Sequence, residues 1–161
     1  MVRSLAVIFS LATMLAQQPQ GYVTSSRYQA NHTATSATSD VVTVQQVAGG
    51  TKTVFFERAW VYCSAACSFT LEQNGTAATA TALAISQLNQ SPPSAVSAYR
   101  GSNVGTGVYV SNPYQVAAGA TYLLDLSYIF LNQNGGTATN MSIRVASASG
   151  TIETTIQWNE P

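Results

Sequence analysis

Charged residues are scarce in this sequence. Six basic and six acidic residues make up 7% of its 161 residues, and they cancel to a net charge of zero. An average soluble protein carries roughly 25% charged residues. Because the chain has no basic field that could attract phosphates, we expect no nucleic-acid partner. Its solubility must come instead from hydroxyl and amide groups, supplied by 18 Ser, 19 Thr and nine Asn, a composition typical of many exported proteins and virion proteins.

Residues for acid–base catalysis are also few. The only histidine, His32, lies in a Ser/Thr-rich stretch. A Ser-His-Asp or Cys-His arrangement would therefore require that stretch to fold back over the core, and a solvated linker histidine is the simpler interpretation. Two carboxylates in one cleft could hydrolyse a glycoside. Glu57 and Asp125 are the only acids inside strongly apolar segments, so they are the pair to inspect.

The simpler interpretation of these two acids is structural. We expect Asp125 to be solvated on an outer face, and Glu57 to pair with an arginine, the candidates being Arg58, Arg100 and Arg144. The glycine-rich segment at 101–107 lacks the strand-to-helix context and the lysine of a phosphate loop. We therefore predict a protein that is not an enzyme, with no catalytic residue and no cofactor.

Only two cysteines occur, Cys63 and Cys67, in the segment YCSAACSF. A zinc site needs about four ligands, which two cysteines and one histidine cannot supply without carboxylates or a second chain. The redox motif has two residues between its cysteines, whereas this pair has three. We therefore predict no metal site. If Cys63 ends one strand and Cys67 begins the next, the two would face each other across a tight hairpin and form a disulfide; two free thiols are the alternative.

Apolar runs long enough to cross a membrane are absent. The run from Leu5 to Ala16 is too short for a bilayer core of about 30 Å but has the length of a signal-peptide core. We expect residues 1–16 to be a signal peptide cleaved after Ala16; a retained apolar segment or a membrane anchor are the alternatives. The mature chain should then lie outside the cell or at the cell surface without a stable membrane span, or in a virion if the segment is retained.

Residues 17–40 show no sustained apolar period and are rich in Ser, Thr and Ala. We interpret them as an extended arm or linker outside the folded domain. Within this arm, Tyr22, Val23 and Tyr28 are large side chains in a strand-compatible segment. Such a segment can add to an exposed sheet edge, so the arm is predicted to dock on a neighbouring subunit. A disordered tether is the alternative.

From residue 41 to 161 the dominant pattern is alternation of apolar and polar residues, which predicts strands with one buried face. The segment CSFTLEQ, for example, places Cys67, Phe69 and Leu71 on one face. Expected strands cover 41–47, 53–62, 67–73, 81–88, 95–99, 107–116, 121–130, 140–146 and 151–158. The strand at 107–116 should break at Asn112-Pro113, because proline cannot donate to a ladder. Eight or nine short antiparallel strands without helices predict a single all-β sandwich of jelly-roll type.

Aromatic residues leave ligand binding open. Eight Tyr and two Trp occur, and Tyr99, Tyr109 and Tyr114 cluster in the polar, Gly-rich middle of the chain, where they could stack on sugar rings; core packing is the alternative. The favoured hypothesis is a non-enzymatic exported structural or adhesive module that associates with itself or with a surface or virion scaffold. A virion decoration or fibre component and a carbohydrate-binding module with a glycan partner are the alternatives, all by fold-level analogy.

Overall fold

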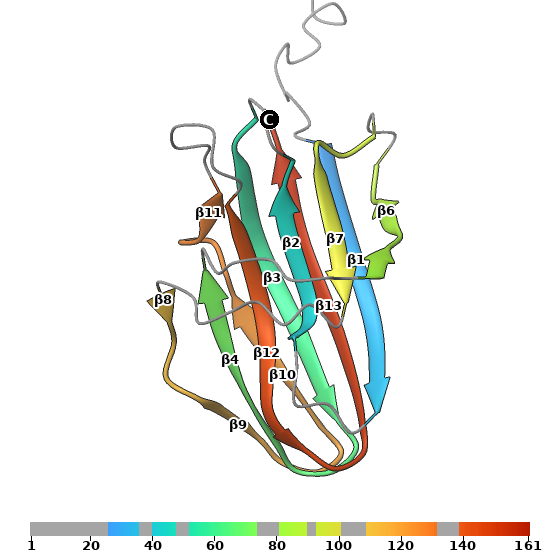
Figure 1. The fold of residues 1–161 in the computed structure, drawn as a ribbon, viewed down its shortest axis with the longest axis vertical. Coiled ribbons are helices and arrows are strands. Elements are labelled where there is room, and N and C mark those ends of the chain that lie inside the picture. Colours follow the sequence, from blue (N-terminus) through green and yellow to red (C-terminus); the bar gives the residue numbers. More distant parts are fainter. Residues whose placement is uncertain are drawn as a thin grey trace, which may run out of the picture.

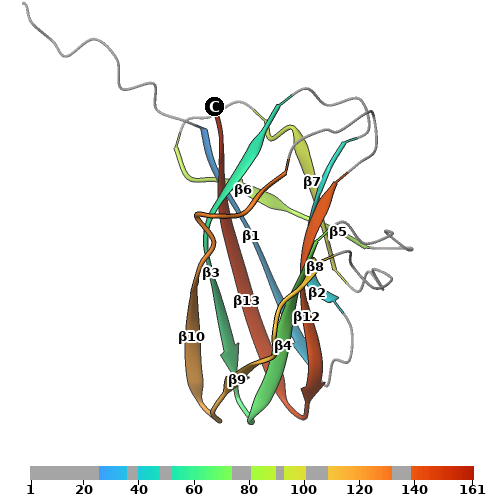
Figure 2. The ribbon, with the colours of Figure 1, turned by 90° about the vertical axis from the view of Figure 1, so that its left-hand side faces the viewer.

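The computed structural model of this chain describes residues 26–35, 40–47, 52–73, 81–89, 93–100, 109–131 and 139–161. These residues form two packed antiparallel sheets and contain no helix (Figures 1 and 2). The all-β sandwich is therefore confirmed. Accordingly, the described residues include no helix that is long and apolar enough to span a membrane.

One sheet has six strands, in the order β10, β3, β13, β1, β6, with β11 also paired to β3. Its strands are β10 (Ala120–Asp125), β3 (Val54–Cys63), β13 (Thr151–Glu160), β1 (Ser26–Thr35), β6 (Ile85–Gln87) and β11 (Phe130–Leu131). The other sheet has seven strands, in the order β5, β7, β2, β12, β4, β8, with β9 also paired to β4. Its strands are β5 (Thr81–Leu83), β7 (Val96–Arg100), β2 (Asp40–Gln46), β12 (Asn140–Ala148), β4 (Cys67–Gln73), β8 (Tyr109–Val110) and β9 (Tyr114–Val116).

The strand order is that of a jelly roll, in which one long hairpin of eight strands is rolled up so that the first strand pairs with the last. Here β1 pairs with β13, β2 with β12, β3 with β10, and β4 with β8 and β9. Strands β5, β6 and β7 lie between β4 and β8 in the sequence and extend the two sheets at their outer edges. The jelly-roll prediction is therefore confirmed.

All nine expected ranges contain strands. Three of them each form two short strands: 81–88 gives β5 and β6, 107–116 gives β8 and β9, and 121–130 gives most of β10 and the first residue of β11. The break between β8 and β9 falls at 111–113 and includes the expected proline. The total is thirteen strands in the described residues rather than eight or nine, and five of them have only two or three residues.

One prediction about the domain boundary is wrong. Residues 26–35, expected to belong to an arm, form β1, which lies between β13 and β6 in the six-stranded sheet and pairs with β13 along ten residues. The domain therefore begins by Ser26, not Val41. His32 is half-buried within β1 rather than on a solvated linker, and this burial, helped by the charge of Arg100, lowers its pKa. The leader and the remaining arm residues, 1–25 and 36–39, lie outside the described residues, and Asp40 begins β2.

The core between the sheets is built on aromatic contacts. Tyr28 of β1 and Trp158 of β13 are both fully buried and stack with ring centroids 5.9 Å apart. Phe69 of β4 stacks in the same way on Tyr114 at 5.1 Å. Burial of rings this large is a major part of the free energy that stabilises a small sandwich.

A buried carboxylate fixes one edge of this core. Glu160 is 1% exposed and accepts hydrogen bonds from the Ser94 hydroxyl, the Ala95 amide at 2.8 Å and Trp158 Nε1 at 3.1 Å. Three donors satisfy a group whose burial would otherwise be costly. The contact ties the end of β13 to the start of β7, which belongs to the other sheet.

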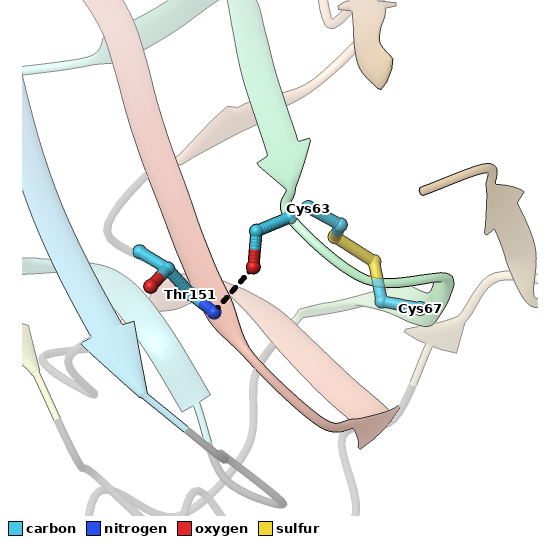
Figure 3. The surroundings of a disulfide bond; sticks show 4 residues. Cys63, Cys67 and Thr151 are labelled. Carbon is cyan, nitrogen blue, oxygen red and sulfur yellow. Dashed lines mark hydrogen bonds between the residues drawn. A yellow bond between two sulfur atoms is a disulfide. The ribbon is translucent and has the colours of Figure 1, made fainter. Parts of the chain in front are cut away.

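The two cysteines form a disulfide, as predicted, but not across a hairpin ladder. Cys63 ends β3 in the six-stranded sheet, and Cys67 begins β4 in the seven-stranded sheet, with Cα atoms 6.2 Å apart (Figure 3). The bond therefore joins the two sheets at one end of the sandwich. The connecting loop is held by Ser64, whose amide donates to the Thr151 carbonyl at 2.8 Å and whose hydroxyl accepts from the Thr151 amide at 2.7 Å.

Gly150 makes this packing possible. Its φ is +127°, and a Cβ at this position would lie 2.6 Å from the Ser64 hydroxyl oxygen. Only glycine adopts such a backbone conformation without strain. The turn between β12 and β13 can therefore rest directly on the disulfide loop.

We predict that replacing both cysteines by alanine (C63A/C67A) lowers the free energy of unfolding by about 2 kcal/mol, because the unfolded chain regains the freedom of a short loop. Urea denaturation of the variant and the wild-type chain under oxidising conditions measures this difference. Wild-type chain in the presence of a reductant is the control and should approach the variant. Equal midpoints for the oxidised wild type and the variant would contradict the prediction.

Candidate functional site

A solvent-open hollow of about 650 Å³ lies on the outer face of the six-stranded sheet. We call it the β3 hollow, because four of its lining residues, 55–58, belong to β3; the others come from β1, β10, β13 and the connection that follows β10. Its charged side chains are Arg27, Glu57, Arg58 and Asp125, and its exposed apolar side chains are Phe55 and Leu123. The hollow therefore combines two arginines, two acids and two exposed apolar side chains.

A β-bulge in β3 creates the hollow. Opposite β13, Arg58 pairs with Gln157 and Phe56 pairs with Trp158, so Glu57 is an extra residue in β3. Phe56 is buried in the core while Glu57 and Arg58, consecutive in sequence, are not. A bulge re-aims side chains in this way and bends the strand. The sequence signal is the pair of adjacent charges that interrupts the apolar segment 53–62.

The chain between β10 and β11 bridges the bulge. The Leu126 amide donates to the Glu57 carbonyl at 3.0 Å, and the Phe56 amide donates to the Ile129 carbonyl at 3.1 Å. Asp125 begins this excursion and accepts a hydrogen bond from the Ser127 amide at 2.9 Å. That bond from the backbone amide, helped by the Ser127 hydroxyl, lowers the pKa of Asp125, which is exposed as expected.

Glu57 is held by an arginine that was not among its expected partners. Arg27 of β1 donates to it through both Nε, at 3.0 Å, and Nη2. Asn159 of β13 adds a long contact at 3.5 Å. The predicted partners Arg58, Arg100 and Arg144 are therefore wrong; Arg58 lies over the ring of Trp60 instead, 5.9 Å from its centroid. Arg27 lies on β1, within the residues that the sequence predicts to form an arm, so the sequence gives no sign that it reaches Glu57.

The ion pair sets the titration of Glu57. Burial alone would raise its pKa, but the hydrogen bonds from Arg27 and Asn159 and the nearby positive charge lower it below the ordinary value. Glu57 and Asp125 do share one hollow, as a two-carboxylate mechanism requires. Both pKa values are lowered, however, whereas glycoside hydrolysis needs one carboxyl group with a raised pKa to act as the acid. The arrangement therefore lacks the asymmetry of such a catalytic pair.

Apolar side chains border the hollow. Phe55 pairs in register with Phe130 of β11, and their rings lie 6.4 Å apart. Leu123 of β10 pairs in register with Trp60. Phe55, Phe130 and Leu123 are 41%, 56% and 59% exposed. Exposed aromatic and aliphatic side chains gathered on one face distinguish it from the ordinary hydroxyl-rich surface of this chain.

The three tyrosines proposed for ligand stacking do not form one surface. Tyr99 lies on β7 and Tyr109 on β8, toward opposite edges of the seven-stranded sheet, with β2, β12 and β4 between them. Tyr114 packs on the buried ring of Phe69 and beside Tyr122. Core packing, the alternative interpretation, therefore describes Tyr114.

The residues proposed for the assembly arm are also separated. Tyr28 is fully buried against Trp158 in its own chain and is not available to a neighbour. Tyr22 and Val23 lie outside the described residues. Within the part of the chain that the structure describes, no three His, Cys, Asp or Glu residues are placed to hold a metal ion.

Comparisons of this chain with protein-family models, with curated proteins and with solved structures find no match. Its function must therefore be inferred from the geometry of the site.

We predict that E57Q lowers the free energy of unfolding by about 1 kcal/mol at pH 7, because it weakens a partly exposed, hydrogen-bonded ion pair. The pKa of Glu57 is lowered in the folded chain from an ordinary value of 4.5. The contribution of the ion pair is thus complete above that pH and is lost as the pH falls through the lower folded-state value. Urea denaturation at neutral and acidic pH should show the difference between E57Q and wild type shrinking on acidification. E153Q, which changes an exposed acid on the same sheet, is the control and should leave stability unchanged at both pH values.

Proposed function

We propose that this chain is a non-enzymatic structural module that associates with copies of itself as a component of a cell surface or a virion. The observation that carries this proposal is the set of exposed apolar side chains on the outer face of the six-stranded sheet, namely Phe55, Leu123 and Phe130. They lie beside charges that neutralise one another. A face of this kind is suited to contact with another protein surface.

The composition of the face supports protein association. The centres of protein interfaces are enriched in aromatic side chains and arginine and depleted in lysine and in acidic residues. Here Phe55 lines the same hollow as Arg27 and Arg58, and Phe130 pairs with Phe55. Arg58 lies over the ring of Trp60, and Glu57 is already paired. Burying a carboxylate that keeps its own arginine costs less than burying an isolated charge.

The same hydrogen bonds argue against chemistry at the hollow. Both Glu57 oxygens are engaged by Arg27, and one Asp125 oxygen is engaged by Ser127. Few polar groups are left to orient a small substrate. Glycan binding is not proposed, because it would need tyrosines that lie side by side, and Tyr99 and Tyr109 lie on strands that are separated by three others.

Location outside the cell is part of this proposal. A disulfide between the sheets is compatible with an oxidising compartment, and residues 1–16 have the pattern of a signal peptide. Intact-mass measurement of the native protein separates the two settings. A chain that begins at residue 17 supports the cell surface, whereas a chain that retains residues 1–16 supports attachment within a virion.

We predict concentration-dependent self-association of the native chain, with half-association at about 1 to 100 µM. Because the charges of the face neutralise one another, the midpoint should change little between about 50 mM and 500 mM salt. Sedimentation velocity over that concentration range measures both properties. A single monomeric species at every concentration would contradict the proposed function.

A further inference from the structure

The edges of the two sheets differ in how they are protected. An open edge exposes unpaired backbone groups to any other strand, so natural proteins shorten, break or charge their edge strands. At three of the four edges here the strands are blunted. Strands β5 and β6 have three residues each, and the edge formed by β8 and β9 is interrupted at 111–113 by a segment that contains Pro113.

The fourth edge is formed by β10 and β11 and is interrupted at 126–129, but among the described residues β10 is the longest edge strand of either sheet. It is a regular strand of six residues without proline or a basic residue, and its pairing with β3 has no register shift. Among the described residues, β10 pairs with β3 alone. Leu123, near its centre, is 59% exposed, more than any other large aliphatic side chain in the described part of the chain. This edge has the features of a strand that receives a partner.

The side chains of β10 are complementary to themselves. Thr121, Leu123 and Asp125 point to the outer face and are exposed, while Tyr122 and Leu124 point to the core. If two copies of β10 run antiparallel about a two-fold axis at Leu123, each Thr121 lies opposite the partner copy's Asp125. Asp125 accepts hydrogen bonds from the amide and hydroxyl of Ser127, and its carboxylate has acceptor sites left for a threonine hydroxyl.

The same arrangement keeps like charges apart. The two Asp125 side chains would lie four residues from each other along the paired strands, about 13 Å. This exceeds the screening length of about 8 Å at physiological salt. Leu123 would lie opposite Leu123 of the second copy at the axis. Core-facing residues of one strand would lie opposite core-facing residues of the other, so the combined sheet keeps one core face and one outer face.

We propose that β10 pairs antiparallel with β10 of a second copy of this chain, with Leu123 at the two-fold axis, so that two six-stranded sheets become one continuous sheet. This inference rests on the proposed function, self-association, and specifies the contact that carries it. A single short strand pair buries little surface, which is consistent with micromolar rather than tighter affinity.

Cysteine cross-linking tests the register directly. Both native cysteines are joined to each other, so an introduced cysteine supplies the only free thiol. In L123C the two new Cβ atoms would be about 5 Å apart, close enough for a disulfide after small adjustment. In T121C, the matched control from the same strand and face, they would be about 13 Å apart. After mild oxidation, L123C should form a covalent dimer on non-reducing electrophoresis, and T121C should stay monomeric.

Three outcomes would overturn the proposal. Cross-linking of T121C as efficient as that of L123C would reject the register. No cross-linking of L123C in a chain that still sediments as an oligomer would reject the β10 contact while leaving self-association intact. Loss of association in a chain that lacks residues 17–25 but keeps β10 would assign the edge to the arm of a neighbour instead.

A second variant guards against an effect of the thiol itself. L123K would place two cations at the axis and should weaken association about tenfold or more, with an unchanged circular dichroism spectrum because the side chain is exposed. L88K changes another exposed leucine, next to β6, and should leave association as in the wild type. Equal weakening by both variants would reject β10 pairing in favour of general surface hydrophobicity.

Discussion

The pairing of the first strand described, β1, with the last, β13, is the constraint on which the remainder of this molecule depends. Their ladder extends over ten residues and is reinforced by the stack of Tyr28 on Trp158. Because β13 lies between β1 and β3, it also brings Arg27 within reach of Glu57 and places Asn159 between them. The hollow therefore exists only when segments more than a hundred residues apart have met, and contacts of such long range make folding slow.

Much of this architecture could be predicted from the sequence, because alternation survives wherever one face is apolar and the other polar. Strand β1 was missed because its inward positions after Tyr28 are Ala30, His32 and Ala34, which are too small or too polar to signal burial. That single omission also hid Arg27, the partner of Glu57. The spacing of the cysteines predicts their pairing. It does not show that their loop connects the two sheets, because a separation of four residues fits both a hairpin within one sheet and a connection between two sheets.

Charged residues are few in this chain, and a third of them gather at the β3 hollow. Of twelve charged residues in the chain, two arginines and two acids line the β3 hollow. Three of these four charged side chains have partners within the chain: Arg27 forms an ion pair with Glu57, and Arg58 lies over the ring of Trp60. A face whose charges are already compensated can be covered by another protein at little electrostatic cost. In the uncovered chain, the apolar side chains around these charges stay exposed to water.

The three-residue length of β6 has a consequence for how large an assembly can grow. If two copies join through β10, the combined sheet ends at a β6 strand on both sides, and neither end offers enough ladder for a third copy to add. Polymerisation along the sheet direction therefore terminates at a pair. A pair joined in this way would be a closed dimer rather than a fibril, and any larger lattice would have to be built through faces, where Phe55 and Phe130 would remain uncovered.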